Sequence, residues 1–229
     1  MKNILIVGGS SGIGLALVEQ LAEDHNVFVA SRTSESLVGK NCTHIPYDVM
    51  SQELDVSLLP ELHGFVYCPG SINLRPFKGL KPETFQADFD LNVMGAIKSL
   101  QALGKNLQAT THASVVFYST VAVQTGMPFH ASVAAAKGAL EGLTRSLAAE
   151  WAPKIRVNCI APSLVNTPLA DKFLNNEAKV EKAGERHPLQ RVGTAKEIAE
   201  ATAYLLSEKS GWMTGQIIQI DGGIGTLKT

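Results

Sequence analysis

Residues 4–18 read ILIVGGSSGIGLALV, and this stretch decides how the chain folds. Its first four residues are aliphatic, which favours a short buried strand. The next seven contain four glycines, and the last four begin an apolar pattern with helical spacing. A strand that passes through a glycine-rich turn into a helix is typical of the first unit of a parallel α/β sheet.

Aliphatic runs alternate with helical stretches along the rest of the chain. This alternation predicts an α/β fold, a Rossmann-type doubly wound parallel sheet of about seven strands with helices on both faces. About a dozen residues separate Arg32 from the third strand, which leaves room for only a stub of helix there. We expect one nucleotide-binding domain over residues 1–229. The predicted strands are 4–7, 27–30, 44–46, 64–67, 114–118, 155–160 and 216–220, and the predicted helices are 12–23, 85–108, 132–150 and 196–207.

The glycine-rich turn is expected to bind the pyrophosphate of a dinucleotide. Glycines allow the tight reversal and the close approach of backbone to phosphate, and the helix that follows directs its positive end at the anion. The alternative is an ordinary glycine-rich turn, but its place between the first strand and the first helix favours binding. The turn residues expected to touch the cofactor are Gly8, Ser10, Ser11, Gly12, Ile13 and Gly14.

The end of the second strand indicates which dinucleotide is bound. An acid there would bind the adenosine ribose 2′-OH of NAD, but this strand ends in Ser31, Arg32 and Thr33. A guanidinium offers a two-pronged donor to a phosphate, so the sequence predicts NADP(H). Glu35 lies close by and is the residue that argues for NAD(H) instead.

Composition argues against several classes of function. The chain has 20 basic and 21 acidic residues and a formal net charge of −1, which suggests neither a nucleic acid nor an anionic membrane as partner. No apolar run approaches the roughly 18 residues of a membrane span or the roughly 7 of a secretory signal core. Three scattered cysteines and the spacing of the histidines suggest no metal site. We expect a cytoplasmic protein with reduced thiols.

From this turn onward the chain resembles the short-chain dehydrogenase/reductase family along nearly its whole length. Gly8, Gly12 and Gly14 match the family's Gly-x-x-x-Gly-x-Gly pattern. Other matching segments are Tyr47-Asp48-Val49, Asn92, 156–163, Thr167, 188–191 and 214–223. Tyr67-Cys68-Pro69-Gly70 keeps only the glycine of the family's Asn-Asn-Ala-Gly, and Ser163 stands where a glycine usually follows the proline. The resemblance implies cofactor contacts by Asp48, Val49, Cys68, Pro69, Gly70, Asn92, Lys137, Pro162, Val165 and Thr167.

The resemblance also implies a catalytic set, and one member of it is missing. The family uses a serine to polarise the substrate carbonyl, a tyrosine to transfer the proton, and a lysine four residues later to hold the nicotinamide ribose and lower the pKa of the tyrosine. An asparagine, here Asn92, keeps a water relay in place. Lys137 matches the lysine and Thr120 the serine, but Val133 stands in the tyrosine position.

No tyrosine lies between Tyr118 and Tyr204, so another group must supply the proton if the chain is active. His130 is the first candidate, because His130, Val133 and Lys137 fall on one helix face if the helix begins at or before His130. The alternative is a polar residue at a helix start that faces solvent. Tyr67, Tyr118 and Cys68 are further possibilities, although packing explains each of them more simply.

Two functions therefore stay open from the sequence. The first is an NADP(H)-dependent oxidoreductase that acts on an unidentified small carbonyl or alcohol with an altered proton donor. The second is a catalytically silent NADP(H)-binding or sensing protein. Residues 169–184 are expected to form a lid over the substrate. The resemblance implies a homodimer or homotetramer that pairs through the small residues of helix 132–150.

Overall fold

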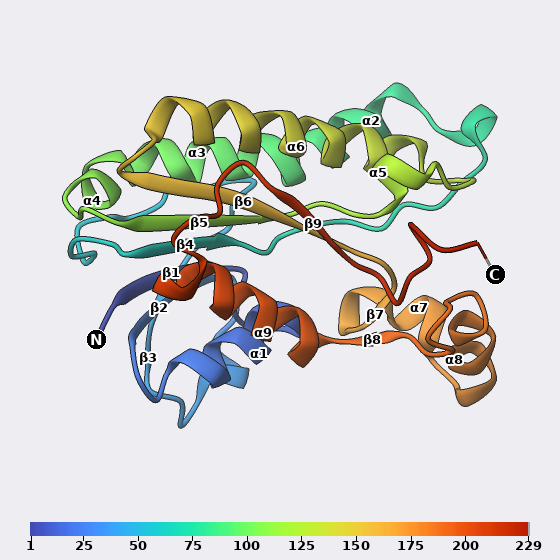
Figure 1. Cartoon of the computed structure of the whole chain (residues 1–229), viewed down its shortest axis with the longest axis horizontal. Helices are drawn as coiled ribbons and strands as arrows, with labels where there is room; N and C mark the ends of the chain where they lie inside the picture. The colour runs from blue at the N-terminus through green and yellow to red at the C-terminus, as the bar shows by residue number, and fades with distance from the viewer. Residues whose placement is uncertain (229) are drawn as a thin grey trace.

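The computed structural model describes residues 1–228 and is organised around a parallel sheet of seven strands. Their order is β3-β2-β1-β4-β5-β6-β9, so the chain moves outward from β1 on one side and then crosses to the other side at β4 (Figure 1). This arrangement confirms the predicted doubly wound sheet. The strands are β1 Asn3–Val7, β2 Asn26–Ser31, β3 Cys42–Pro46, β4 Gly64–Tyr67, β5 Ala113–Tyr118, β6 Ile155–Pro162 and β9 Ile217–Ile220.

Helices cover both faces of this sheet, as Figure 1 shows. Alternate side chains of β5 point to opposite layers: Val115 and Phe117 pack with α6, and Val116 and Tyr118 lie in the layer with α1 and α9. Burial on both faces is why the strands have continuous apolar sequences. The first layer holds α2 Pro82–Phe89, α3 Gly95–Ala102, α4 Gly104–Gln108, α5 Ala122–Thr125 and α6 Ala131–Trp151, and the second holds α1 Gly12–Leu21 and α9 Ala195–Leu206.

The predicted helix over residues 85–108 is wrong as a continuous element. The chain forms α2, a π-helical turn at Asp90–Met94, α3 and then α4. A π turn widens the helix by one residue, and such turns are often found at functional sites. The pattern of apolar residues does not reveal it, because the apolar face continues on both sides of the turn. The expected stub of helix between β2 and β3 is confirmed as a 3-10 turn at Glu35–Leu37.

A smaller unit follows β6 and lies beyond the carboxyl ends of the strands. A two-stranded ladder joins β7 Val165–Asn166 to β8 Gly193–Thr194, and between them lie the 3-10 turn Pro168–Ala170, α7 Asp171–Leu174 and α8 Glu177–Gly184. Figure 1 shows this unit at the right, at the end of the molecule where α6 begins. Two more 3-10 turns are at Phe77–Gly79 and Glu208–Ser210. Among residues 1–228, no helix is long and apolar enough to cross a membrane.

Candidate active site

A cavity of about 880 Å³ opens at the carboxyl ends of the central strands. Its volume lies within the range of about 300–1,000 Å³ that is common for small-molecule and cofactor sites. At one end it is lined by the glycine-rich turn and Arg32, and at the other by the start of α6 and the unit that holds α7 and α8. Every site residue predicted from the sequence lines this cavity, except Asn92, which is fully buried behind it.

The glycine-rich turn is shaped so that its backbone faces the cavity. Gly8 has φ +79°, a left-handed conformation that favours glycine, and a Cβ on Gly14 would collide with the carbonyl oxygen of Gly8. Helix α1 then begins at Gly12 with no side chain capping its first N–H groups, which leaves them for an anion. The Ser10 hydroxyl lies 3.2 Å from the Thr33 hydroxyl, which ties the turn to the end of β2.

The three residues predicted at the end of β2 differ in whether their side chains are free to contact a ligand. Arg32 is exposed, and none of the ion pairs found in residues 1–228 involves it. Ser31 is buried, and its hydroxyl donates to the carbonyl oxygen of Thr33 at 2.8 Å, so it shapes the loop. Asp48, across the cavity wall, accepts from the Met50 N–H at 3.0 Å. The guanidinium of Arg32 is therefore the cation available to a ligand at this end.

Lys137 and Asn92 meet next to Gly70. A Cβ on Gly70 would lie 3.3 Å from both Lys137 Nζ and Asn92 Oδ1, a tighter approach than most real Cβ contacts, so a larger residue would crowd both groups. Burial lowers the pKa of Lys137 to about 8, against smaller opposing effects of Cys159, Cys68 and Asp88. The site thus holds a desolvated ammonium beside an amide oxygen.

Asn92 is fixed by a buried polar cluster that the sequence did not indicate. Its Nδ2 donates to the Ser71 hydroxyl at 3.0 Å and to the Asp88 carbonyl oxygen at 2.7 Å. Asp88 Oδ1 accepts from Ser71 at 2.6 Å and from Asn73 at 2.7 Å. Among the described residues, Asn92 Oδ1 has no partner although it is buried. A buried acceptor without a protein partner is uncommon, and this oxygen is suited to accept a hydrogen bond from a water molecule or a ligand.

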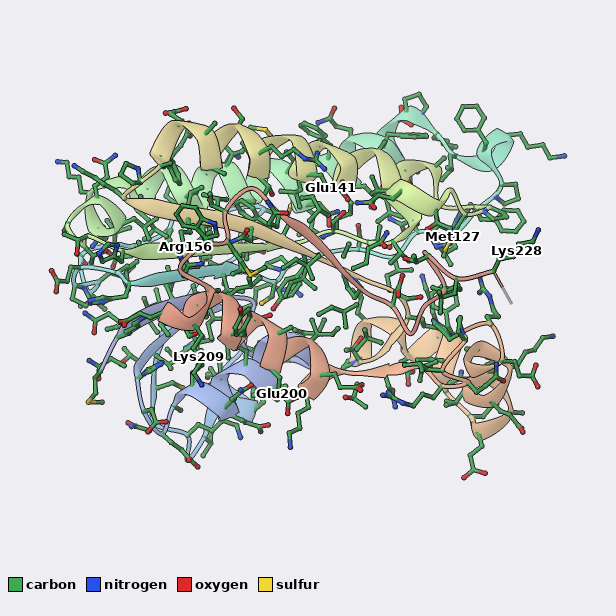
Figure 2. All side chains as sticks on the ribbon, viewed as in Figure 1. Met127, Glu141, Arg156, Glu200, Lys209 and Lys228 are labelled. Carbon is green, nitrogen blue, oxygen red and sulfur yellow. The ribbon has the colours of Figure 1, made fainter. Side chains whose placement is uncertain are left out.

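Two hydroxyls follow β5, and only one is left for a substrate. Ser119 is buried and donates to Glu141 Oε1 at 2.7 Å, and Glu141 Oε2 lies 3.7 Å from the partly exposed guanidinium of Arg145. Glu141, labelled in Figure 2, belongs to α6, and its carboxylate reaches Ser119 at the end of β5. Thr120 accepts weakly from the Ala122 N–H at 3.3 Å and lines the cavity. Thr120 is therefore the hydroxyl that can donate to a bound ligand.

The position expected for a tyrosine is apolar in this cavity. Val133 is buried in the wall, on the same helix as Lys137. His130 caps the start of α6, lines the cavity as well and places its Nδ1 2.7 Å from the Pro128 carbonyl oxygen. His130, Val133 and Lys137 all line one cavity, although α6 begins at Ala131, one residue after His130.

The other groups considered as proton donors are occupied or inert. Tyr67 does not line the cavity, and its hydroxyl donates to the Leu91 carbonyl oxygen at 2.6 Å. Tyr118 lies 2.7 Å from the Thr202 hydroxyl, and burial raises the pKa of both tyrosines. Burial also raises the pKa of Cys68 to about 12, so its thiol stays protonated and unreactive near neutral pH. Packing accounts for all three.

The cleft fits a nicotinamide dinucleotide at both ends. The glycine cradle and the free N–H groups of α1 suit a pyrophosphate, and Arg32 suits an additional phosphate. Lys137 and the unpartnered Asn92 oxygen suit a hydroxylated sugar and a water molecule. The other cofactor contacts expected from the sequence all lie on the cavity wall: Val49, Pro69, Pro162, Val165 and Thr167.

Comparison with known proteins gives consistent results over almost the whole chain. Residues 7–225 match a family model described as enoyl-(acyl carrier protein) reductase. The chain is 32% identical to a tropinone reductase homolog of Arabidopsis thaliana over 97% of this chain and 91% of that protein. It is 33% identical to a 2,5-dichloro-2,5-cyclohexadiene-1,4-diol dehydrogenase of Sphingobium indicum, over 99% of this chain and 98% of that one.

Solved structures show the same architecture. A short chain dehydrogenase family protein from Francisella tularensis superposes with a TM-score of 0.91 at 31% identity, over 99% of this chain and 100% of the other. A gluconate 5-dehydrogenase from Burkholderia cenocepacia, solved in complex with NADP and tartrate, superposes with a TM-score of 0.89 at 25% identity, over 99% and 96% of the two chains.

Proposed function

The chain belongs to the short-chain dehydrogenase/reductase family, and from that membership we propose that it is an NADP(H)-dependent oxidoreductase whose proton donor is not a tyrosine. The substrate is a small carbonyl compound or the corresponding alcohol. The observation that carries the proposal is that Lys137, Thr120 and the glycine-rich turn line one cavity, with the Asn92 amide oxygen next to Gly70 in the cavity wall. A protein that only bound the dinucleotide would have little use for this inner set.

The choice of NADP(H) rests on Arg32. Arg32 is exposed and lines the cavity together with Ser10 and Thr33, and its guanidinium could give a 2′-phosphate a charge-assisted pair of hydrogen bonds. Glu35 is exposed but does not line the cavity, so it does not compete for that place. The complex of the related gluconate 5-dehydrogenase with NADP supports the same choice.

Different residues of the cavity would bind the cofactor, polarise the substrate and supply the proton. When bound, the nicotinamide supplies or accepts the hydride. Lys137 would hold the sugar next to it through its ammonium group, and Thr120 would donate a hydrogen bond to the substrate oxygen as negative charge develops there. Val133 has no proton to give. The proton must come from another group on the cavity wall, and His130 is the candidate that the sequence suggests.

Turnover is the experiment that tests this function. The purified protein is mixed with NADPH and a panel of activated aldehydes and ketones, and the loss of reduced cofactor is followed together with alcohol formation. We expect slow but definite turnover, because loss of a positioned acid typically reduces a rate by about 10²–10⁴ without removing the rest of the site. If NADPH binds and no member of the panel is reduced, the silent binding protein is the better description.

A further inference from the structure

A serine and a histidine that are 24 positions apart form a hydrogen bond in the cavity wall. The Ser163 hydroxyl lies 2.8 Å from His187 Nε2, and both residues line the cavity. Ser163 follows β6, and His187 lies beyond the end of α8. Ser163 stands where a glycine usually follows the proline in the family pattern, so a side chain has been added at this point.

The surroundings of His187 fix which of its two ring nitrogens carries the proton when the ring is neutral. Nδ1 lies 2.9 Å from the carbonyl oxygen of Ala183, which can only accept, so Nδ1 is the N–H donor of the neutral ring. Nε2 is then the acceptor for the Ser163 hydroxyl. His187 is 4% exposed, and it packs against Gly222, where a Cβ would lie 3.3 Å from that of His187. The ring is therefore held in one orientation.

Ser163 lies beside the hydroxyl that is expected to polarise the substrate. The Val121 N–H donates to the Pro162 carbonyl oxygen at 3.2 Å, so the chain after β5 runs alongside the chain after β6. Thr120 precedes Val121, and Ser163 follows Pro162. Both hydroxyls thus come from neighbouring strand ends and face the same cavity.

We propose that Ser163 and His187 form the proton relay that replaces the missing tyrosine. This inference rests on the proposed function and identifies the proton donor that the proposed reaction needs. In reduction, the carbonyl carbon of the substrate receives a hydride from the reduced nicotinamide, and its oxygen takes the proton of the Ser163 hydroxyl. Ser163 Oγ takes the Nε2 proton of the His187 imidazolium, which becomes neutral and later regains a proton from water. Alcohol oxidation runs through the same steps in reverse.

Two comparisons favour this relay over the alternatives. His130 is half-buried at a loop, with a single hydrogen bond to the Pro128 carbonyl oxygen, whereas His187 is buried and held at both nitrogens. A covalent role for Ser163 in acyl transfer would need backbone donors for an oxyanion, but its own N–H already donates to the Ile220 carbonyl oxygen at 3.3 Å. Proton transfer, by contrast, needs only the Ser163 hydroxyl and the His187 imidazole.

The kinetic test compares four variants at the pair with one matched control. Ser163→Ala and His187→Gln should each lower kcat by at least tenfold, with the Kd for NADPH unchanged by fluorescence titration. The double variant should be no slower than the slower single one, because the two groups act in one step. Ser163→Thr keeps a hydroxyl and should retain most of the activity. His112→Gln, at an exposed histidine outside the cavity wall, should leave kcat unchanged.

The outcomes separate this inference from the proposed function. Turnover that is indifferent to Ser163→Ala and His187→Gln but lost in His130→Ala would overturn the relay and leave the oxidoreductase in place. Absence of any turnover by the wild type would overturn both. A fall in both Ser163→Ala and Ser163→Thr would also count against the relay, because it would point to packing at this position.

Nitrogen NMR of the histidine rings gives a readout that needs no turnover. In the wild type, the neutral form of the His187 ring should carry its proton on Nδ1. Its Nε2 resonance should shift in Ser163→Ala, while that of His130 stays in place. A neutral His187 ring protonated on Nε2 would reverse the hydrogen bond to Ser163 and contradict the relay.

Discussion

Replacing Lys137 by methionine should stabilise the cofactor-free protein at neutral pH. An unfolded lysine has its ordinary pKa of 10.5, whereas burial lowers the pKa of Lys137 to about 8 in the folded chain. Between these values the unfolded state binds more protons, so folding becomes more favourable as the pH rises. Below pH 8 the full cost of the buried charge is present, and at 1.36 kcal/mol per pKa unit it is about 3 kcal/mol.

Urea unfolding of the cofactor-free protein at two pH values measures this cost. The gain in unfolding free energy from Lys137→Met should be at most about 3 kcal/mol at pH 7 and should fall to about 1.4 kcal/mol at pH 9.5. Lys196→Met, at an exposed lysine on α9, is the matched control and should change little at either pH. A Lys137→Met protein that is less stable at pH 7, or a gain that is independent of pH, would refute the assignment of Lys137 as a desolvated ammonium.

Three further results are expected. NADPH should bind at least tenfold more tightly than NADH, about 1.4 kcal/mol, and Arg32→Ala should remove most of this preference; equal Kd values in the wild type would contradict the choice of cofactor. Lys179, Lys182 and Arg186 line the cavity, whereas Asp48 is the only acidic residue among residues 1–228 that does. Carbonyl compounds that bear a carboxylate should therefore have lower KM values than neutral analogues, and Lys182→Glu should reduce this difference in KM. Sedimentation at micromolar concentration should give a dimer or larger, and Gly142→Arg, at a position with open space around it on α6, should yield the monomer with its fold intact.

The sheet could be read from the sequence because each strand carries its own local signal. The predicted strand at 64–67 coincides with β4, and the predicted helix at 132–150 lies within α6. The helix predicted at 85–108 is interrupted at Leu103, between α3 and α4, and at the π turn, where the backbone widens around Asn92. That change depends on the buried bonds of Asn92 and Asp88 to Ser71, a residue from another part of the chain, so a local pattern could not contain it.

The candidate site, like the fold, could be predicted from the sequence only in part. The glycine-rich turn and the positions of Val133 and Lys137 could be located, because each lies within one short motif. Ser163 could be recognised as a departure from the family pattern, but nothing in the sequence connected it with His187, since α7 and α8 separate them along the chain. One departure was available as a signal, a serine after Pro162 in place of glycine, and His187 stands directly before the Pro188 motif. Their contact depends on how the unit between β7 and β8 folds back onto the strand ends.

Reduction of a carbonyl compound by the wild-type protein and by Val133→Tyr, each with NADPH, tests most directly whether this chain is an active oxidoreductase. The wild type should consume NADPH and form one equivalent of alcohol, because the hydride-transfer site and a separate proton donor are both present. Wild-type protein that binds NADPH but reduces nothing, together with a Val133→Tyr variant that gains turnover, would contradict this prediction. The lysine and Thr120 would then be remnants of a site that lost its acid.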